Sequence, residues 1–469
     1  MGDTSLTRRD FIKLVGAGSA ALALGGGLGS AFAADGVRKP NIVLLFADDL
    51  GYGEIGCYGR GDIPTPNIDS IASNGIRFTD GYVSCPVCSP TRAGLMTGRY
   101  QQRFGHEFNP GPPADLGTDF GLPLTETTIA SRLKSEGYTT GIVGKWHLGF
   151  EKKYLPLNRG FDEFFGFAGG AHSYVNSSDS KNPIMRGNKP VEEKDYLTDA
   201  LAREAVSFID RHRDRPFFLY VPFNAVHAPL QAPPKYMDRF SKITDQKRRT
   251  FAAMLSAMDD AVGEVLKTLR KNRLEDNTLI IFLSDNGGPT PQTTSRNDPL
   301  RGFKGQVYEG GVRIPFVMQW SGHIPAGKVL DKPIISLDLA PTILAAAGGK
   351  TSGAGFDGVD LMPCIKDGGT PHDALYWRFG PQFAIREGNW KLLKTTGGKL
   401  ELYDLSTDIG EKTDLAEKNP EKVKALTDRY EEWNAQLAKP LWGPRGSRQS
   451  GQPGRQRRPR ARRVPSAAN

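Results

Sequence analysis

The sequence predicts an α/β fold: a large mixed, mostly parallel sheet sandwiched by helices, with a smaller C-terminal α+β subdomain. Three observations support this prediction. Short apolar runs recur along the chain, helical patterns separate them, and the character of the sequence changes after about residue 345. Regular alternation of strand and helix is typical of doubly wound domains, in which helices cover both faces of a sheet.

Four runs of apolar and β-branched residues predict buried strands. They are NIVLLF, which leads to Asp48, TTGIVG, which leads to Lys145, FFLYVPF, which ends at Asn224, and TLIIFLS, which leads to Asp285. Such continuous runs are typical of strands buried on both faces of a parallel sheet. Polar residues follow each run, and open α/β sheets bind ligands at the carboxyl ends of their strands.

Segments with apolar residues spaced by three or four predict helices before the last three strands. They are TTIASRLKSEG, YLTDALAREAVSFIDRHRD and TFAAMLSAMDDAVGEVLKTLRKN. Further along, FAIREGNWKLLK predicts a hairpin, and a final helix begins with Asn419 as N-cap and Pro420 in its first turn. We therefore expect a catalytic α/β domain over residues 34–345 and an α+β subdomain over residues 346–440.

The first 33 residues are typical of a twin-arginine export signal. Arg8 and Arg9 precede a weakly apolar run rich in Gly and Ala, and residues 31–33 (AFA) offer a cleavage site. An anchoring helix is the alternative, which the high glycine content disfavours. We expect the twin-arginine translocase as a partner, a periplasmic or secreted protein, and no stable membrane span after cleavage.

The formal net charge of +9 lies mostly at the C-terminus, because the chain from Arg445 onward holds eight arginines and no acidic residue. The rest of the chain is nearly neutral, so we expect no nucleic-acid partner. Residues 441–469, rich in Pro, Gly, Gln and Ser, predict a basic disordered tail. This tail is either a solvated extension or an arm that binds polyanions.

Acidic residues follow the first and fourth predicted strands, as Asp48-Asp49 and Asp285-Asn286. Three carboxylates at one sheet edge repel each other unless a cation neutralises them. Carboxylate and amide oxygens favour Ca²⁺ or Mg²⁺ over a thiolate-bound zinc ion. The alternative is that each pair caps a helix or forms a turn.

Basic and titratable residues surround this predicted metal site. Lys145 and His147 are two residues apart, which puts them on one face of an extended segment, and His227 follows the third strand. With Arg92 and Lys304 they suit an anionic tetrahedral group, so the sequence indicates phosphate or sulfate ester chemistry. Taken singly, each histidine could instead be a structural hydrogen bonder.

The segment CPVCSPTR, residues 85–92, predicts a helix N-terminus at Cys88, because Pro90 suits a first helical turn. Helix dipole and free amides favour negative charge there, on a nucleophile or on an oxyanion. Thr91 could cap the helix, and Arg92 could pair with the anion. The alternatives are a Cys85-Cys88 disulfide, a redox pair or half of a metal site; Cys57 and Cys364 are expected to be inert.

Residues 88–99, CSPTRAGLMTGR, resemble the signature of the formylglycine-dependent sulfatases, Cys-x-Pro-Ser/Thr-Arg followed by x-x-x-Leu-x-Thr-Gly-Arg. The resemblance continues through FADDLGYGEIGCYG, GYTTGIVGKWHLG, PLNRGFDEFFGF, FLSDNGG, LRGFKGQVYEGGVRIPF and ELYDLSTDIGEKTDLA, from Pro40 to about Pro440. It implies an alkaline phosphatase-like fold and an enzyme of the N-acetylgalactosamine-6-sulfatase or polysaccharide sulfatase type.

The resemblance also implies a mechanism. A formylglycine-generating enzyme would oxidise Cys88 to an aldehyde, whose hydrate attacks sulfur and later expels sulfate. The implied metal ligands, usually of calcium, are Asp48, Asp49, Asp285 and Asn286, with the modified Cys88. Arg92 would steady the hydrate, and Lys145 and His147 would bind it, His147 taking a proton. His227 and Lys304 would bind sulfate oxygens and help to protonate the leaving alcohol.

Three loops hold candidate substrate-binding residues, His106, His172 and Arg296, together with several aromatic residues. Such sets bind sugar hydroxyls and stack on rings, so we expect a sulfated carbohydrate, for example a 6-sulfated galactose or N-acetylgalactosamine unit, or an aryl sulfate. Either histidine could instead hold its own loop in place. Two other functions stay open: a phosphonate or phosphate ester hydrolase with the same nucleophile, and a non-catalytic protein that binds sulfated glycans if Cys88 is unmodified.

Overall fold

The structure is a computed structural model that describes residues 38–111, 120–179 and 181–444. The predicted export signal and the tail from Arg445 lie outside these residues, so those two predictions stay predictions. The described residues from Lys39 onward form one compact unit. No helix in the described part of the chain is long and apolar enough to cross a membrane.

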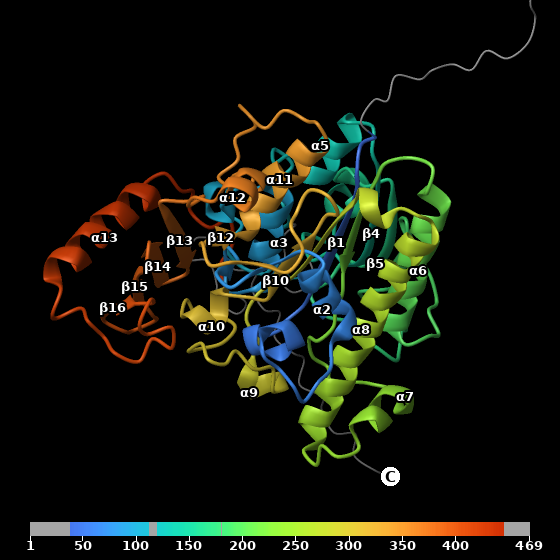
Figure 1. Ribbon diagram of the computed structural model, residues 1–469, viewed down its shortest axis with the longest axis horizontal. Helices are drawn as coiled ribbons and strands as arrows, with labels where there is room; N and C mark the ends of the chain where they lie inside the picture. The colour runs from blue at the N-terminus through green and yellow to red at the C-terminus, as the bar shows by residue number, and fades with distance from the viewer. Residues whose placement is uncertain (1–37, 112–119, 180, 445–469) are drawn as a thin grey trace, which may run out of the picture. The chain divides into compact units, whose positions relative to one another are not determined.

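A ten-stranded sheet lies at the centre of this unit, in the order β11-β2-β10-β9-β1-β8-β4-β5-β6-β7 (Figure 1). The strands from β9 to β5 are parallel, and β10 and β6 are antiparallel to their neighbours. The strands are β1 Asn41–Ala47, β2 Ile76–Phe78, β4 Thr139–Lys145, β5 Glu163–Phe167, β6 Met185–Arg186, β7 Lys189–Pro190, β8 Phe217–Pro222, β9 Thr278–Ser284, β10 Phe316–Gln319 and β11 Lys328–Leu330. The predicted mixed, mostly parallel sheet is confirmed, although β8 ends at Pro222 rather than at Asn224.

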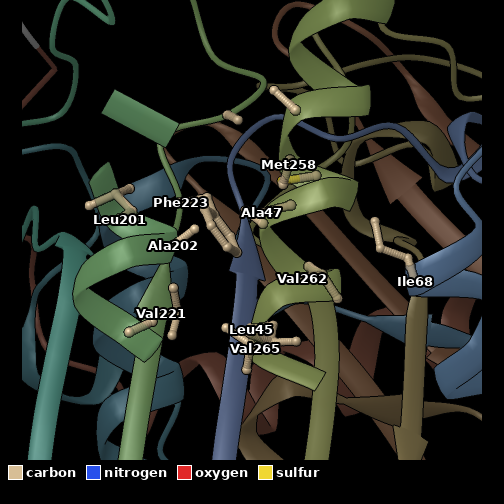
Figure 2. Close-up of a cluster of buried hydrophobic side chains, with 14 of the residues drawn as sticks. Leu45, Ala47, Ile68, Leu201, Ala202, Val221, Phe223, Met258, Val262 and Val265 are labelled. Atoms are coloured by element: carbon tan, nitrogen blue, oxygen red, sulfur yellow. The ribbon is translucent and has the colours of Figure 1, made fainter. Parts of the chain in front are cut away.

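Helices cover both faces of the sheet. Helices α2 (Pro66–Ser73), α6 (Leu197–His212) and α8 (Gln246–Lys271) lie on one face, and α3 (Cys88–Thr97), α5 (Ile129–Ser135) and α11 (Leu339–Ala346) lie on the other. Successive side chains of a strand point to opposite faces. In β1, Leu45 and Ala47 accordingly pack with α8, as Figure 2 shows, while Leu44 and Phe46 pack on the α3 side.

A second, four-stranded antiparallel sheet makes up the C-terminal part. Its strands are β13 Ala374–Phe379, β14 Gln382–Glu387, β15 Trp390–Lys394 and β16 Leu400–Asp404, and helix α13, Pro420–Asn434, packs against it. The predicted hairpin is the β14-β15 pair. Asn419 stands at the N-cap of α13, but its side chain makes no cap bond and donates to the Leu415 carbonyl instead. The predicted α+β subdomain is confirmed with two more strands than expected.

Short elements complete the described residues. They are β3 Gly81–Tyr82, β12 Ile334–Ile335, α7 Pro234–Met237, α9 Thr290–Thr293, α10 Glu309–Val312, α12 Met362–Asp367, and the 3₁₀ turns Tyr52–Glu54, Gly56–Tyr58, Gln101–Phe104, Lys152–Tyr154, Pro156–Asn158, Asp238–Phe240, Glu275–Asn277 and Ser336–Asp338.

The first residues of the predicted tail differ from expectation. Trp442 is 2% exposed, and its indole Nε1 donates to the Phe108 carbonyl at 3.1 Å. The Leu441 amide donates to the Gly105 carbonyl. The chain therefore packs against residues 105–108 before the arginine-rich segment begins. An apolar Trp in a polar, arginine-rich context gave no periodic pattern from which this contact could be read.

Candidate active site

Parallel strand ends bring the predicted site residues to one edge of the main sheet. Asp48 and Asp49 follow β1, Lys145 ends β4, and Asp285 follows β9. The Asp49 amide donates to Asp285 Oδ1 at 3.1 Å, which ties the ends of β1 and β9 together. This edge is where a doubly wound sheet places its ligands.

The three buried aspartates are each paired with a cation. Lys145 Nζ lies 2.6 Å from Asp48 Oδ2, and Lys304 Nζ lies 2.6 Å from Asp49 Oδ1. Arg92 contributes its NH2 group to Asp285 Oδ2 at 2.8 Å. Because the side chains of Asp48, Asp285, Arg92 and Lys145 are fully buried, these charges are desolvated and interact strongly.

The pKa values of Asp48 and Asp285 are shifted in opposite directions. Burial raises the pKa of Asp48, with Asp285 adding to the effect. Burial acts the same way on Asp285, but Arg92, Lys145 and Lys304 outweigh it and hold the pKa of Asp285 well below its usual range. The raised pKa of Asp48 therefore reflects mainly the cost of burying its charge, which a bound cation would offset.

Cys88 opens helix α3, as predicted, with Val87 at the N-cap. Its Sγ lies 3.2 Å from Lys304 Nζ and 3.6 Å from Asp48 Oδ1. Burial, reinforced by Asp285, raises the pKa of Cys88 to about 12. The thiol is therefore neutral at physiological pH and a poor nucleophile as it stands.

The alternative of a Cys85-Cys88 disulfide finds no support, because all four cysteines are free. The predicted cap at Thr91 is wrong. Its hydroxyl donates to the Cys85 carbonyl at 2.8 Å, since Thr91 lies inside the first turn and its side chain reaches back to the preceding turn.

The prediction that His147 shares an extended face with Lys145 is also wrong. Strand β4 ends at Lys145, and His147 adopts a left-handed backbone with φ of 59°. Its imidazole is nevertheless buried beside the cations. Burial, followed by Lys145 and Arg92, holds the pKa of His147 well below its usual range. The ring is therefore neutral and able to accept a proton.

The oxygen atoms at this edge fit a hard divalent cation. Ligand atoms of Asp48, Asp49, Cys88 and His227 lie within 4.8 Å of one another. Asn286 donates through Nδ2 to Asp49 Oδ1 at 2.7 Å, while its buried Oδ1 has no hydrogen-bond partner among the described residues. An unpartnered buried carbonyl beside three carboxylates matches the oxygen donors that Ca²⁺ prefers. His227 Nε2 lies 3.6 Å from Asp49 Oδ2, at the rim of this group.

The three candidate substrate-binding residues occupy different environments. Arg296 is exposed on the loop after α9, where its amide donates to Glu54. His172 is 4% exposed, and its Nε2 has no partner among the described residues. His106 is completely buried and contacts Ser89 and Trp442, so it has no surface with which to bind a sugar.

Sequence reasoning missed Ser89. Its hydroxyl donates to the His147 carbonyl at 2.6 Å and lies 2.7 Å from His106 Nε2. Ser89 therefore links two histidines that lie far apart in the sequence. Its position next to Cys88 was the one available signal.

Comparison with known proteins assigns this chain to a family. The profile of the Sulfatase family matches residues 40–349, which hold every residue of the cluster. The chain belongs to the sulfatase family. A second profile, N-sulphoglucosamine sulphohydrolase, C-terminal, matches residues 303–436 of this sulfatase.

Similar proteins agree with this assignment. The sulfatase is 36% identical to human arylsulfatase A over 467 residues, covering 86% of this chain and 88% of the human protein. It is 36% identical to the N-acetylgalactosamine-6-sulfatase of Canis lupus familiaris over 392 residues, covering 78% and 73% of the two chains. The crystal structure of Ps i-CgsB in complex with k-i-k-neocarrahexaose has a TM-score of 0.83 and 38% identity, covering 86% of this chain and 95% of that chain. The sulfatase is a sulfuric ester hydrolase.

Proposed function

We propose that this sulfatase removes sulfate from a sulfated carbohydrate, with a formylglycine made from Cys88 and a bound Ca²⁺ ion. The position of Cys88 carries the proposal: the residue opens a buried helix at the sheet edge where Asp48 and Lys304 meet. A neutral thiol at this place has little reactivity of its own. Its oxidation by a formylglycine-generating enzyme would supply a hydrated aldehyde, whose hydroxyl is the nucleophile.

The metal would be held by Asp48, Asp49, Asp285 and Asn286, with the modified Cys88 as a further ligand. Ca²⁺ suits this set better than Mg²⁺, because Ca²⁺ accepts irregular all-protein oxygen sites whereas Mg²⁺ usually keeps several waters. When bound, the ion would supply positive charge for a sulfate oxygen. The unpartnered Oδ1 of Asn286 supports this assignment.

The remaining residues divide between the nucleophile and the ester. Arg92 and Lys145, both fully buried, are anchored by Asp285 and Asp48 and would orient the modified side chain. Neutral His147 would accept its proton. Lys304 and His227, the more exposed members, would hold the sulfate oxygens and assist the leaving alcohol.

A carbohydrate substrate is supported by the names of the relatives, one an N-acetylgalactosamine-6-sulfatase and one bound to a neocarrahexaose. Arg296, exposed beside the site loops, is the candidate for contact with the sugar, and His172 is the second. We also propose that the chain reaches the periplasm or the exterior through the twin-arginine translocase, on the strength of residues 1–33.

The direct test compares matched esters on the purified, exported enzyme. We expect sulfate release from an aryl sulfate and from a 6-sulfated galactose or N-acetylgalactosamine oligosaccharide, with much slower release from the matched aryl phosphate and phosphonate. Faster cleavage of the phosphorus esters would favour the alternative hydrolase. Tight binding of the sulfated oligosaccharide without release would favour a glycan-binding protein, and the Cys88→Ala variant provides the inactive reference.

A further inference from the structure

A chain of hydrogen bonds runs from the protein interior to His147. The Ser89 hydroxyl donates to the His147 carbonyl at 2.6 Å, and Ser89 Oγ lies 2.7 Å from His106 Nε2. Ser89 and His106 are both completely buried. We propose that Ser89 and His106 are positioning residues that hold the backbone of His147, and this rests on the proposed function in which His147 accepts a proton.

The bonding pattern fixes the tautomer of His106. A carbonyl oxygen only accepts hydrogen bonds, so the single Ser89 hydroxyl proton is committed to His147. His106 Nε2 must then carry a proton and donate it to Ser89 Oγ. Burial lowers the pKa of His106 to about 3, which keeps the ring neutral at working pH. The backbone of Gly121 acts against burial and raises the pKa of His106, but burial has the larger effect.

His147 needs such support because its backbone is strained. A non-glycine residue at φ of 59° adopts a sparsely populated conformation, which persists only where the surroundings enforce it. The His147 amide donates to the Ala168 carbonyl at 3.1 Å, and Ser89 holds the carbonyl on the other side. Gly170 packs directly on the ring, where an added Cβ would lie 2.6 Å from His147 Nε2. Both the peptide and the imidazole of His147 are therefore held from outside.

His106 is in turn held by Trp442. Its ring meets the indole of Trp442 edge-on, with centroids 4.7 Å apart. Trp442 Nε1 donates to the Phe108 carbonyl, and the Ser89 amide donates to Asn109 Oδ1 at 3.0 Å. Before the histidine, the Leu441 amide donates to the Gly105 carbonyl at 2.9 Å. The segment that carries His106 is thus fixed on both sides of the histidine, which gives the hydrogen bond to Ser89 a defined geometry.

The tautomer is testable without any turnover. We expect the ring nitrogen signals of ¹⁵N-histidine-labelled protein to show His106 neutral with its proton on Nε2, assigned by their loss in the His106→Gln variant. A His106 protonated on Nδ1 would overturn the proposal. This result does not depend on formylglycine, so it separates a failure of the positioning chain from a failure of the proposed function.

The kinetic test uses Ser89→Ala with Ser84→Ala as its matched control. The Ser84 hydroxyl is equally buried and donates to Gln101 of the neighbouring turn, but it does not contact His147. With rates normalised to the aldehyde content, we expect Ser89→Ala to lower kcat about tenfold, the effect of about one lost buried hydrogen bond. For Ser84→Ala, both the KM and the kcat should change less than about twofold, because the hydrogen bond that this variant loses is remote from His147.

Conservative replacement sharpens the test. His106→Gln keeps an N–H donor for Ser89, whereas His106→Phe keeps the ring against Trp442 but loses the donor. We expect His106→Gln to retain most of the kcat and His106→Phe to fall with Ser89→Ala. An unchanged kcat in Ser89→Ala, or an equal loss in Ser84→Ala, would overturn the proposal.

Discussion

Two buried clusters have the same numbers of acidic and basic side chains but differ in how their polar atoms are paired. The active-site cluster contains Asp48, Asp49, Asp285, Arg92, Lys145 and Lys304. The inter-sheet cluster, which joins the region before β10 to the C-terminal sheet, contains Asp80, Glu309, Glu411, Arg313, Arg386 and Lys391. Each has three carboxylates and three cations.

The inter-sheet cluster is held together by ion pairs among its own members. Lys391 Nζ bridges Glu309 at 2.8 Å and Glu411 at 2.9 Å, and Arg313 bridges Glu309 and Asp80. Burial alone would raise the pKa of Glu309, but Lys391 and Arg313 outweigh it and lower this pKa to about 2. Each carboxylate of this cluster therefore has a cation of the same cluster within ion-pair distance.

The active-site cluster also has equal numbers of carboxylates and cations, but several of its buried polar atoms lack a hydrogen-bond partner among the described residues. Asn286 Oδ1, Arg92 Nε and His147 Nδ1 are all buried without a hydrogen-bond partner among the described residues. A divalent cation could take Asn286 Oδ1 as a ligand and would leave the cluster with a net positive charge, which favours an anionic ester, while Arg92 Nε could donate to an anion. The comparison teaches that the kind of unpartnered atom matters: the active-site cluster has a free carbonyl oxygen on Asn286, whereas Glu411 Oε1 of the inter-sheet cluster, which also lacks a hydrogen-bond partner, lies 2.9 Å from Lys391 Nζ.

The largest expected effect is the loss of turnover when the proposed nucleophile of the active-site cluster is removed. Cys88→Ala should lower the turnover of an aryl sulfate by a factor on the order of 10⁴–10⁶, because the reacting group is gone. The free energy of unfolding should change little, since the substitution removes one sulfur atom from a polar site. Turnover within tenfold of the wild type would show that Cys88 does not carry the reaction.

The second effect is structural. Lys391→Met should lower the free energy of unfolding by about 3–5 kcal/mol, because it leaves buried Glu309 and Glu411 without their shared cation. Urea unfolding measures this change. The control, Lys399→Met, removes an exposed pair with Asp414 and should change the free energy of unfolding far less than Lys391→Met does. Equal stabilities of the two variants would contradict the structural role of the inter-sheet cluster.

The third effect concerns the unpartnered atoms. Ca²⁺ at about a hundred times its dissociation constant should raise the free energy of unfolding by about 2.7 kcal/mol, and a chelator should reverse the gain. Asn286→Ala should reduce this gain because it removes a ligand oxygen. Asn272→Ala, at the C-terminus of α8, should keep it. A gain that survives in Asn286→Ala would place the ion elsewhere.

The smallest effect is a pH dependence of the inter-sheet cluster. Burial raises the pKa of Glu411 from 4.5 to about 7, so the folded chain keeps a proton there that the unfolded chain has lost. Stability should therefore fall as the pH rises from 4.5 to 7, by at most about 1.4 kcal/mol per pH unit from this group. Glu411→Gln does not titrate and should remove that slope, while an unchanged slope in urea unfolding at pH 5 to 8 would contradict the assignment.

Strand ends made part of this molecule predictable from sequence. Asp48, Asp49 and Asp285 follow apolar runs, and parallel strands carry their carboxyl ends to one edge, so their convergence needed no coordinates. The left-handed backbone at His147 was not predictable in this way. The prediction assumed that the strand continues past Lys145, whereas β4 ends there.

Contacts between residues far apart in the sequence could not be predicted from it either. Glu309 and Lys391 lie 82 residues apart, and no local pattern announces their pairing. His106 looked like a loop residue suited to sugars because its sequence neighbours are polar and glycine-rich. The burial under Trp442 depends on a contact between residues 336 positions apart.

The central claim is the conversion of Cys88, and the most direct measurement is the mass of the tryptic peptide 78–92, FTDGYVSCPVCSPTR, from exported protein. We predict one free thiol, at Cys85, and a mass lowered by the exchange of the Cys88 CH₂–SH group for an aldehyde. Two free thiols, or a disulfide between Cys85 and Cys88, in enzyme that is fully active would contradict the account.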